Sequence, residues 1–247
     1  MISPASTVSY DPPMDLAGYA PVADAIRERL RTGGAPAVVV GVGGSVCVGK
    51  STTCERIRSL LHPVTTEVVT TDGFLFPNAE LDRRGMTHEK GFPASYDVDA
   101  LDSFLLRLRG GSAGVRVPVY SHETYDVVPD VTRELVDAAV VIVEGVNALQ
   151  FADRLDLTVY VDAPEEAIEG WYADRLVGIF AAAPPGSFYA ELGFDEEQQR
   201  AFADQVWSGI NHHNLVDHIL PTRARAAIVV EKGPDHEVQR VRFAAGA

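Results

Sequence analysis

Short apolar runs occur at five places along the chain, and most of them are continuous rather than alternating. They are rich in β-branched residues and cover residues 37–42, 67–71, 138–143, 155–161 and 226–230. Strands that are buried on both faces of a parallel sheet have this composition, because neither side of the strand meets water. The runs therefore predict five strands of a mainly parallel sheet.

Helical periodicity fills most of the intervals between these runs. Apolar residues recur three or four positions apart around residues 22–30, 57–61, 101–108, 168–179 and 202–210. Pro164 suits the first turn of the fourth of these helices. Strand and helix alternate, which favours an α/β fold, a doubly wound sheet with helices on both faces. We expect residues 17–247 to form a single domain, preceded by a loose arm over residues 1–16.

A glycine-rich segment follows the first predicted strand and precedes a helical pattern. It has the spacing G-x-x-x-x-G-K-[ST] and comprises Gly44, Ser45, Val46, Cys47, Val48, Gly49, Lys50, Ser51 and Thr52. Glycines let backbone N–H groups close around phosphate oxygens, and the following helix adds the positive end of its dipole. The lysine reaches the β- and γ-phosphates, and the hydroxyl after it can hold Mg²⁺. The segment therefore predicts an ATP-binding phosphate loop, as in P-loop NTPases.

Two other interpretations of these glycines fail. A dinucleotide-binding loop needs a third glycine at position 46, where this chain has Val46. A GTPase needs a guanine-reading N-K-x-D segment, which the sequence lacks. The remaining motifs of the chain are typical of a P-loop kinase that acts on a small molecule.

Charge and composition narrow the class of partner. The 247 residues carry a formal net charge of −14, which repels nucleic-acid phosphates and anionic membrane surfaces. The sequence shows no secretion signal and no apolar run of about 18 residues. Its two cysteines, Cys47 and Cys54, do not suggest a disulfide framework. We expect a cytoplasmic protein that binds a small molecule and neither nucleic acid nor membrane.

Two acidic residues end predicted strands. Asp72 follows the second run in VVTTDGF, and Glu144 follows the third in VVIVEG. The carboxyl ends of parallel strands face one crevice, so both carboxylates should lie beside the phosphate loop. Phosphoryl transfer to an alcohol needs a carboxylate that orients the hydroxyl and accepts its proton, which suits Asp72. Glu144 suits a Mg²⁺ ligand. The alternative is that these acids only cap the turns that follow them.

Residues farther along the chain could complete such a site. Arg175 lies one helical turn after Tyr172 and could neutralise the transferred phosphoryl group; the alternative is a surface salt bridge. Tyr120, His122 and Tyr125 cluster in PVYSHETYD, which suits the wall of a binding pocket. Taken alone, such residues are more often ordinary half-buried loop side chains.

Taken together, eight parts of the sequence resemble the type I bacterial pantothenate kinases. In chain order they are GSVCVGKSTT, TTDGFLFPN, EKGFPASYD, PVYSHETYD, VEGVNALQ, WYADR, INHHNL with ILPTRAR, and KGPDHEVQRVR. The resemblance covers most of the chain from about residue 38 onward. KGFPxSYD and PVYSHxxYD are more specific than the phosphate loop and separate this family from its uridine kinase relatives.

The resemblance implies phosphorylation of the primary hydroxyl of pantothenate by ATP with Mg²⁺, the entry step to coenzyme A. It also implies that Asp72 is the catalytic base. On the nucleotide and Mg²⁺ side it implies Lys50, Ser51 and Glu144, with His236 near the adenine. The residues implied on the pantothenate side are Tyr120, His122, Tyr125, Tyr172, Arg175 and Asn211.

The chain departs from the family pattern in several ways. Glu55 stands where the family has an arginine that binds the inhibitor coenzyme A, so that ligand's phosphates should be repelled. Leu176, Ile179 and Leu192 stand where aromatic residues of the substrate pocket are expected. The segments before the phosphate loop and after VNALQ are shorter than in the family. The first of them carries the family's dimer element and part of its adenine pocket, so whether this chain forms a homodimer stays open.

Three functions are therefore open from the sequence. The first is a kinase that phosphorylates pantothenate. The second is a family member retuned to another hydroxylated substrate, such as a nucleoside or an intermediate of specialised metabolism. The third is a regulator that binds ATP without transferring phosphate. The retained Asp72 argues against the third, because a protein that only binds ATP has no use for a base.

Overall fold

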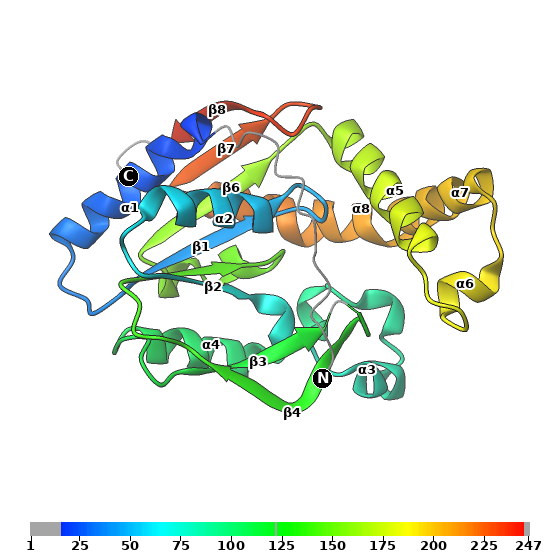
Figure 1. Ribbon diagram of the computed structural model, residues 1–247, viewed down its shortest axis with the longest axis horizontal. Coiled ribbons are helices and arrows are strands. Elements are labelled where there is room, and N and C mark those ends of the chain that lie inside the picture. The colour runs from blue at the N-terminus through cyan, green and yellow to red at the C-terminus, as the bar shows by residue number, and fades with distance from the viewer. Residues whose placement is uncertain (1–15, 122, 245–247) are drawn as a thin grey trace, which may run out of the picture.

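A six-stranded sheet forms the centre of the molecule, in a computed structural model that describes residues 16–121 and 123–244 (Figure 1). The strand order is β2-β5-β1-β6-β7-β8. The first five of these strands pair in parallel and β8 pairs antiparallel with β7. Their bounds are β1 Val38–Gly44, β2 Thr66–Thr70, β5 Val140–Glu144, β6 Leu157–Asp162, β7 Ile228–Lys232 and β8 Val238–Phe243. The predicted mainly parallel sheet is confirmed.

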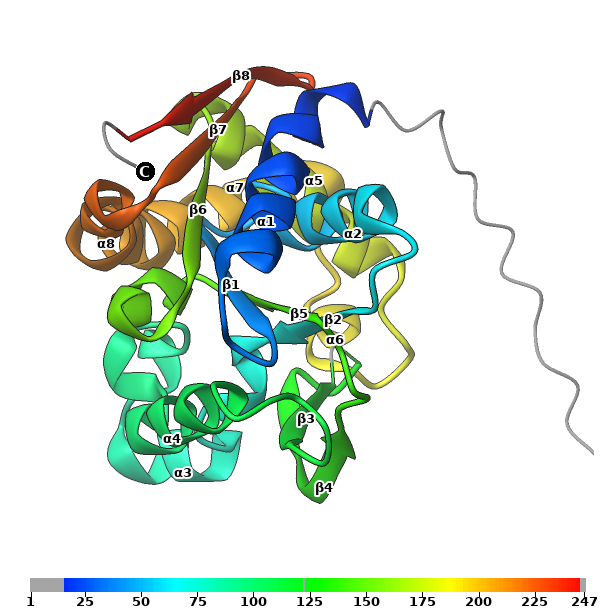
Figure 2. The same cartoon turned by 90° about the vertical axis from the view of Figure 1, so that its left-hand side faces the viewer.

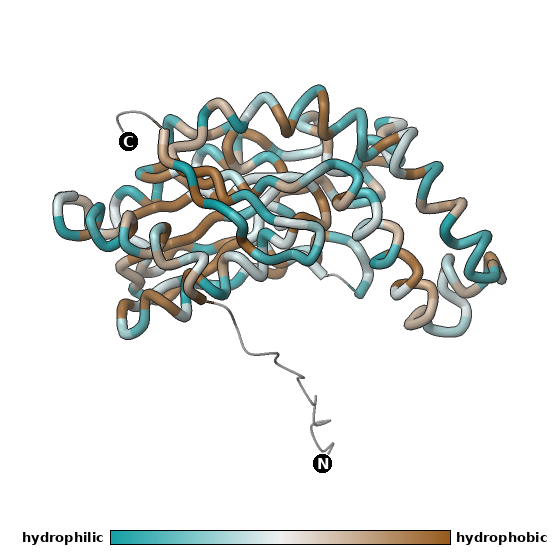
Figure 3. The backbone as a smooth tube through the Cα atoms, turned by 90° about the horizontal axis from the view of Figure 1, so that it is seen from above, coloured by the Kyte–Doolittle hydropathy of each residue, from teal (hydrophilic) through white to brown (hydrophobic). Residues whose placement is uncertain are grey.

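Two apolar cores cover the two faces of this sheet, because side chains alternate along each strand. Val38, Val40 and Val42 of β1 point into a core shared with α1 (Ala20–Thr32) and α2 (Lys50–Leu61). Val39 points into the opposite core, which contains α4 (Val98–Leu108). Figure 2 shows α1 and α2 on one side of the sheet and α4 on the other. Apolar segments gather along the central strands in Figure 3.

The strands β5 and β6 are consecutive in the chain but do not pair. Both pair with β1, which lies between them. A 3-10 segment, Ala148–Arg154, makes the connection, so the short linker expected here is a compact turn that packs on β1.

Several elements were not expected from the sequence, among them a hairpin, an edge strand and a short helix. A separate two-stranded hairpin is made by β3 (Arg116–Ser121) and β4 (Asp126–Glu134). The strand β8 closes the edge of the main sheet, and a short helix α3 spans Asn78–Arg84. Many residues of β4 and β8 are exposed. Their sequences therefore lack the apolar runs by which the buried strands were found.

The segment after β6 extends away from the sheet as an arm of helices (Figure 1). It consists of α5 (Glu165–Ala181), α6 (Phe188–Leu192) and α7 (Glu196–Val206). Pro164 is the N-cap of α5. The arm has its own apolar cluster, built around Phe180 and Ala203 and separate from the two sheet cores. A π-helical turn at Trp207–Asn211, the short α8 (His212–Asn214) and a second π-helical turn at Leu215–Ile219 return the chain to the sheet.

Among the described residues, every helix is too short or too polar to cross a membrane. The arm expected over residues 1–16 lies outside the described residues, except for residue 16.

Candidate active site

The phosphate loop joins β1 to α2 and has the backbone geometry that its glycines allow. Gly49 has φ +82° at the N-cap of α2, and Gly44 has φ +144° where a Cβ atom would lie 2.4 Å from the carbonyl oxygen of Val161. A side chain would not fit at Gly44. Lys50 Nζ donates to the carbonyl oxygen of Ser45 at 2.8 Å. The Lys50 side chain thus links the end of the phosphate loop to Ser45 near its beginning.

A cleft of about 950 Å³ opens at the carboxyl ends of the parallel strands. Most of the predicted site residues line it: Val46, Cys47, Gly49, Lys50, Ser51, Thr52, Asp72, Tyr120, Glu144, Tyr172, Arg175, Asn211 and His236. Gly44, Ser45 and Val48 are buried residues of the loop and do not line the cleft. Tyr125 is exposed outside the lining, and His122 lies outside the described residues.

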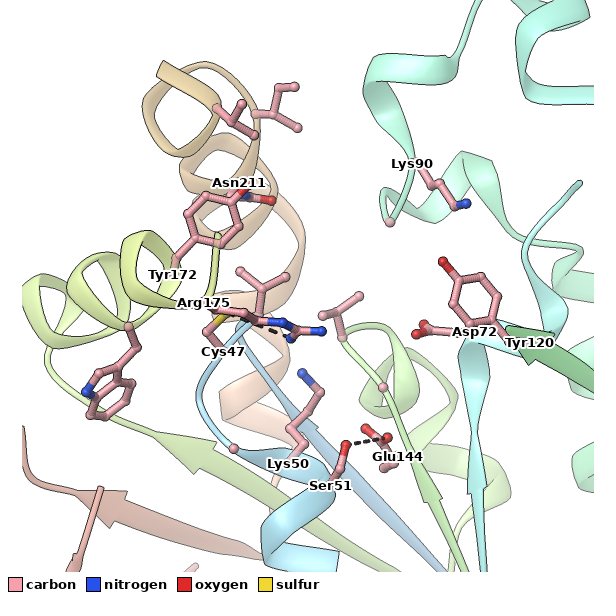
Figure 4. A pocket seen from close by; sticks show the side chains of 18 of the residues that line it. Cys47, Lys50, Ser51, Asp72, Lys90, Tyr120, Glu144, Tyr172, Arg175 and Asn211 are labelled. Carbon is pink, nitrogen blue, oxygen red and sulfur yellow. Dashed lines mark hydrogen bonds between the residues drawn. The ribbon is translucent and has the colours of Figure 1, made fainter. Parts of the chain in front are cut away.

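Ser51 and Glu144 come together from α2 and the end of β5. The Ser51 hydroxyl donates to Glu144 Oε1 at 3.0 Å, as Figure 4 shows. A hydroxyl beside a carboxylate, both next to a phosphate loop, is an oxygen donor set of the kind that Mg²⁺ prefers. The two side chains therefore fit the magnesium role predicted for them.

Asp72 lies across the cleft from these two residues (Figure 4). It sits in a 3-10 turn, Thr71–Phe74, directly after β2, and its backbone N–H donates to the Thr70 hydroxyl at 3.2 Å. The hydroxyl of Tyr96 donates to Asp72 Oδ1 at 3.5 Å. Burial, and then the charge of Asp72, raises the pKa of Tyr96 well above its usual value, so this phenol stays a donor.

Lys90 enters the cleft beside Asp72 from the loop that follows α3. Its ammonium donates to Asn78 Oδ1 at 2.6 Å and to the carbonyl oxygen of Tyr125, and it lies 5.3 Å from the ring centre of Tyr120. Desolvation by burial lowers its pKa. Gly91, which follows Lys90, is held by Asn214, whose Nδ2 donates to the carbonyl oxygen of Gly91 at 2.9 Å.

The arm of helices supplies the other wall of the cleft. Arg175 on α5 reaches over the phosphate loop, where its Nη1 lies 3.9 Å from Cys47 Sγ (Figure 4). Burial raises the pKa of the Cys47 thiol, so the neutral thiol faces this guanidinium. Tyr172 and Asn211 lie side by side above Arg175 (Figure 4), and burial raises the pKa of Tyr172. Asn211 ends a π-helical turn, a feature that often occurs at functional sites.

Aromatic stacking marks the end of the cleft near the turn between β7 and β8. His236 stacks on Trp171 with ring centres 3.6 Å apart and planes 19° apart. Trp171 Nε1 donates to the carbonyl oxygen of Pro234 at 3.2 Å. Burial lowers the pKa of His236, which favours the neutral imidazole.

The cleft collects cations in a chain whose net charge is −14. The sequence contains three lysines, and all three line the cleft: Lys50, Lys90 and Lys232. Arg56 and Arg175 line it as well, against the carboxylates of Asp72 and Glu144. Such a local positive field suits a polyphosphate ligand despite the acidic surface.

Several contributors to the cleft were not singled out from the sequence. Lys90 and Tyr96 lie within EKGFPASYD, and Trp171 begins WYADR, so an inspection of every polar or aromatic position in those motifs could have found them. Lys232 ends the parallel strand β7, as Glu144 ends β5. Tyr189 on α6 also lines the cleft, and no sequence signal indicated it.

The structure corrects the interpretation of Leu176, Ile179 and Leu192 as positions of the substrate pocket. All three pack in the apolar cluster of the arm and do not line the cleft. Glu55 also lies outside the lining, on α2, where it forms an ion pair with Arg58.

Comparisons with known proteins agree with this geometry. The sequence profile of the phosphoribulokinase/uridine kinase family matches residues 39–171. A pantothenate kinase from Sorangium cellulosum is 47% identical in an alignment of length 224 that covers 83% of this chain and 72% of that protein. A pantothenate kinase from Streptomyces coelicolor is 42% identical in an alignment of length 252 that covers 90% of this chain and 76% of that protein.

Solved structures share the fold at low sequence identity. A putative fructose transport system kinase from Silicibacter has a TM-score of 0.63 at 20% identity, over 86% of this chain and 94% of that one. A D-glycerate 3-kinase from Cryptococcus neoformans has a TM-score of 0.61 at 12% identity, over 93% and 99%. The fold is thus that of the P-loop kinases, and the chain belongs to the pantothenate kinase family, within the phosphoribulokinase and uridine kinase family.

Proposed function

We propose that this protein transfers the γ-phosphoryl group of ATP to the primary hydroxyl of pantothenate. The observation that carries the proposal is the position of Asp72, which faces the phosphate loop across one cleft while cations surround the space between them. The acceptor comes from the names of the relatives, which are pantothenate kinases at 42–47% identity.

Asp72 is the base in this proposal. Its carboxylate accepts a hydrogen bond from the acceptor hydroxyl and takes its proton as the hydroxyl oxygen bonds to the γ-phosphorus. The bond between that phosphorus and the β,γ-bridging oxygen breaks, and ADP leaves. Tyr96, which donates to Asp72 Oδ1, fixes the direction of the carboxylate and leaves its other oxygen for the acceptor.

Charge stabilisation comes from both walls of the cleft. Lys50 lies at the base of the phosphate loop and Arg175 above it, so the transferring group would meet a cation on either side. Ser51 and Glu144 would hold Mg²⁺. When bound with ATP, this ion would supply further neutralisation of phosphate charge. His236 would contact the adenine.

The acceptor side has the polar and aromatic groups that a small hydroxylated acid needs. Tyr120, Tyr172 and Asn211 line the cleft on this side, and Lys90 adds a cation beside Asp72. We assign His122 and Tyr125 to the same side as part of the proposal. A carboxylate-bearing substrate suits this set, because burying its charge requires a paired cation.

The alternative of a retuned substrate has less support than the sequence alone indicated. It rests on Leu176, Ile179 and Leu192 in place of aromatic residues and on Glu55 in place of an arginine. The three apolar residues pack in the cluster of the arm, and neither they nor Glu55 line the cleft. A regulator without activity is also disfavoured, since Asp72 and the cations are arranged for transfer and not only for binding.

The test is ADP release with Mg-ATP, using pantothenate and a panel of nucleosides as acceptors. We expect turnover on pantothenate, and a loss of about 10²–10⁴-fold in kcat for Asp72→Asn with ATP affinity retained. Asp99→Asn is the matched control, because Asp99 is exposed on α4 and outside the cleft. An unchanged rate in Asp72→Asn would refute the role of Asp72. Turnover on a nucleoside alone would replace pantothenate by that acceptor.

A further inference from the structure

Lys232 is a buried cation that the proposed mechanism does not use. It is the last residue of β7, is only 3% exposed, and lines the cleft behind the phosphate loop. A lysine is seldom buried to this extent unless a partner offsets the loss of its hydration. Its surroundings should therefore reveal what it binds.

Its ammonium contacts the phosphate loop itself. Lys232 Nζ donates to the carbonyl oxygen of Val48 at 3.1 Å and to that of Gly49 at 3.4 Å. Gly49 is the left-handed residue at which the loop turns into α2, and a Cβ atom there would lie 2.7 Å from Lys232 Nζ. The lysine thus holds two carbonyl groups of the phosphate loop at the point where the loop turns into α2.

Arg56 and Lys50 add like charge near this ammonium, and Glu237 adds an opposite charge without forming an ion pair with it among the described residues. Burial, followed by the charge of Arg56, lowers the pKa of Lys232 to about 8. Two carbonyl dipoles only partly offset the cost of burying a charge. A bound polyanion would offset the rest.

We propose that Lys232 is a positioning residue of the nucleotide site, which holds the phosphate loop in its binding conformation and is itself stabilised by the charge of bound ATP. The inference deepens the proposed function and rests on it. It assigns Lys232 to the affinity for ATP and not to the chemical step. In the free protein the buried charge of Lys232 lowers the free energy of unfolding, and binding of ATP raises it again.

Three variants test this inference. Lys232→Met removes donor and charge at similar length, Lys232→Gln keeps a neutral donor, and Arg242→Met removes a cation that pairs with Glu231 outside the cleft. Calorimetric Kd for Mg-ATP should rise roughly tenfold or more in Lys232→Met, less in Lys232→Gln, and stay unchanged in Arg242→Met. The kcat at saturating ATP should stay within about twofold and the KM for the acceptor should not move.

Thermal unfolding without nucleotide separates this role from a structural one. Lys232→Met should unfold at the same temperature as the wild type or above it, because the variant no longer buries an unpaired charge. A lower unfolding temperature together with an unchanged Kd would show a lysine that only supports the fold, and would overturn the inference. If the wild type itself does not bind Mg-ATP, the proposed function fails as well.

The pH dependence of the KM for ATP provides a second readout. Below pH of about 8 Lys232 is charged and should favour ATP, so the KM should rise as the pH passes above that value. In Lys232→Gln this rise should vanish; a rise that persists there would contradict the assignment. The other titratable or charged groups around Lys232 are Lys50, Cys54 and Arg56 on α2 and His236 and Glu237 in the β7–β8 turn. The pKa of the Cys54 thiol is raised and that of His236 is lowered, so neither accounts for a change near pH 8.

Discussion

Glu55 lies on the exposed side of α2, where it forms an ion pair with Arg58. The resemblance to the type I bacterial pantothenate kinases implies that those proteins have, at this position, an arginine that binds the phosphates of coenzyme A. A carboxylate there repels phosphates, and Arg58 is already engaged with it. We therefore expect coenzyme A to inhibit this enzyme weakly or not at all.

The measurement is initial velocity at the KM of ATP with increasing coenzyme A, for the wild type and for Glu55→Arg. Inhibition should be weak in the wild type and stronger in the variant. Tight inhibition of the wild type that is competitive with ATP would show that Glu55 does not govern this ligand.

At the scale of residues, the sequence predicted many of the side chains that line the cleft, but fewer of those that support them. Asp72, Lys50 and Glu144 follow from the phosphate-loop motif and from the rule that strand ends face one crevice. Lys232 obeys the same rule at the end of β7 and begins the segment KGPDHEVQRVR, but it was assigned no role from the sequence. Leu176 was misassigned, since a helix shows from sequence which residues are apolar but not which neighbour they pack against.

Gly49 is the N-cap of α2 and lies at the end of the phosphate loop that joins β1 to this helix. Its φ of +82° is left-handed, and a Cβ atom would displace Lys232 Nζ from the loop carbonyls. We expect Gly49→Ala to lower the free energy of unfolding by about 1–2 kcal/mol and to raise the KM for ATP. Gly34→Ala is the control, because a Cβ atom there would meet nothing within 4 Å and its φ is not in the left-handed range.

These two glycine variants would be compared by chemical denaturation and by steady-state kinetics. Equal stability of Gly49→Ala and the wild type would contradict the backbone strain expected for an alanine at a φ of +82°.

At the scale of elements, burial decided what the sequence could predict. The parallel strands β1, β5, β6 and β7 are largely buried, β2 is half-buried, and apolar runs mark all five in the sequence. The hairpin β3–β4 and the edge strand β8 face solvent along much of their length, and polar strands resemble loops when no apolar alternation marks them. The two π-helical turns after α7 were not predictable either, because an inserted residue does not change the apolar spacing enough to be noticed.

The whole molecule brings two walls together around the cleft, the arm of helices on one side and the loop that carries Lys90 on the other. Because this cleft exists only when both walls are folded, a ligand that binds in it binds the folded state alone. We expect Mg-ATP at one hundred times its Kd to stabilise the protein by about 2.7 kcal/mol, or roughly 5–10 °C in Tm.

Differential scanning fluorimetry with increasing Mg-ATP tests this expectation. Lys50→Met should lose most of the shift, whereas Asp72→Asn should keep it, since Asp72 is assigned to the acceptor. Equal shifts in wild type and Lys50→Met would place the nucleotide elsewhere.

The confinement of all three lysines to the cleft has a practical consequence for the chemistry of this protein. Reagents that acylate primary amines usually modify many surface lysines, but the described surface outside the cleft presents arginines, which such reagents leave intact. Apart from the α-amino group, every acylated position would therefore report on the cleft. Lys232, whose pKa is about 8, would be uncharged often enough to react near neutral pH when solvent reaches it. Amine-based immobilisation or dye coupling would inactivate the protein, and added ATP would protect it.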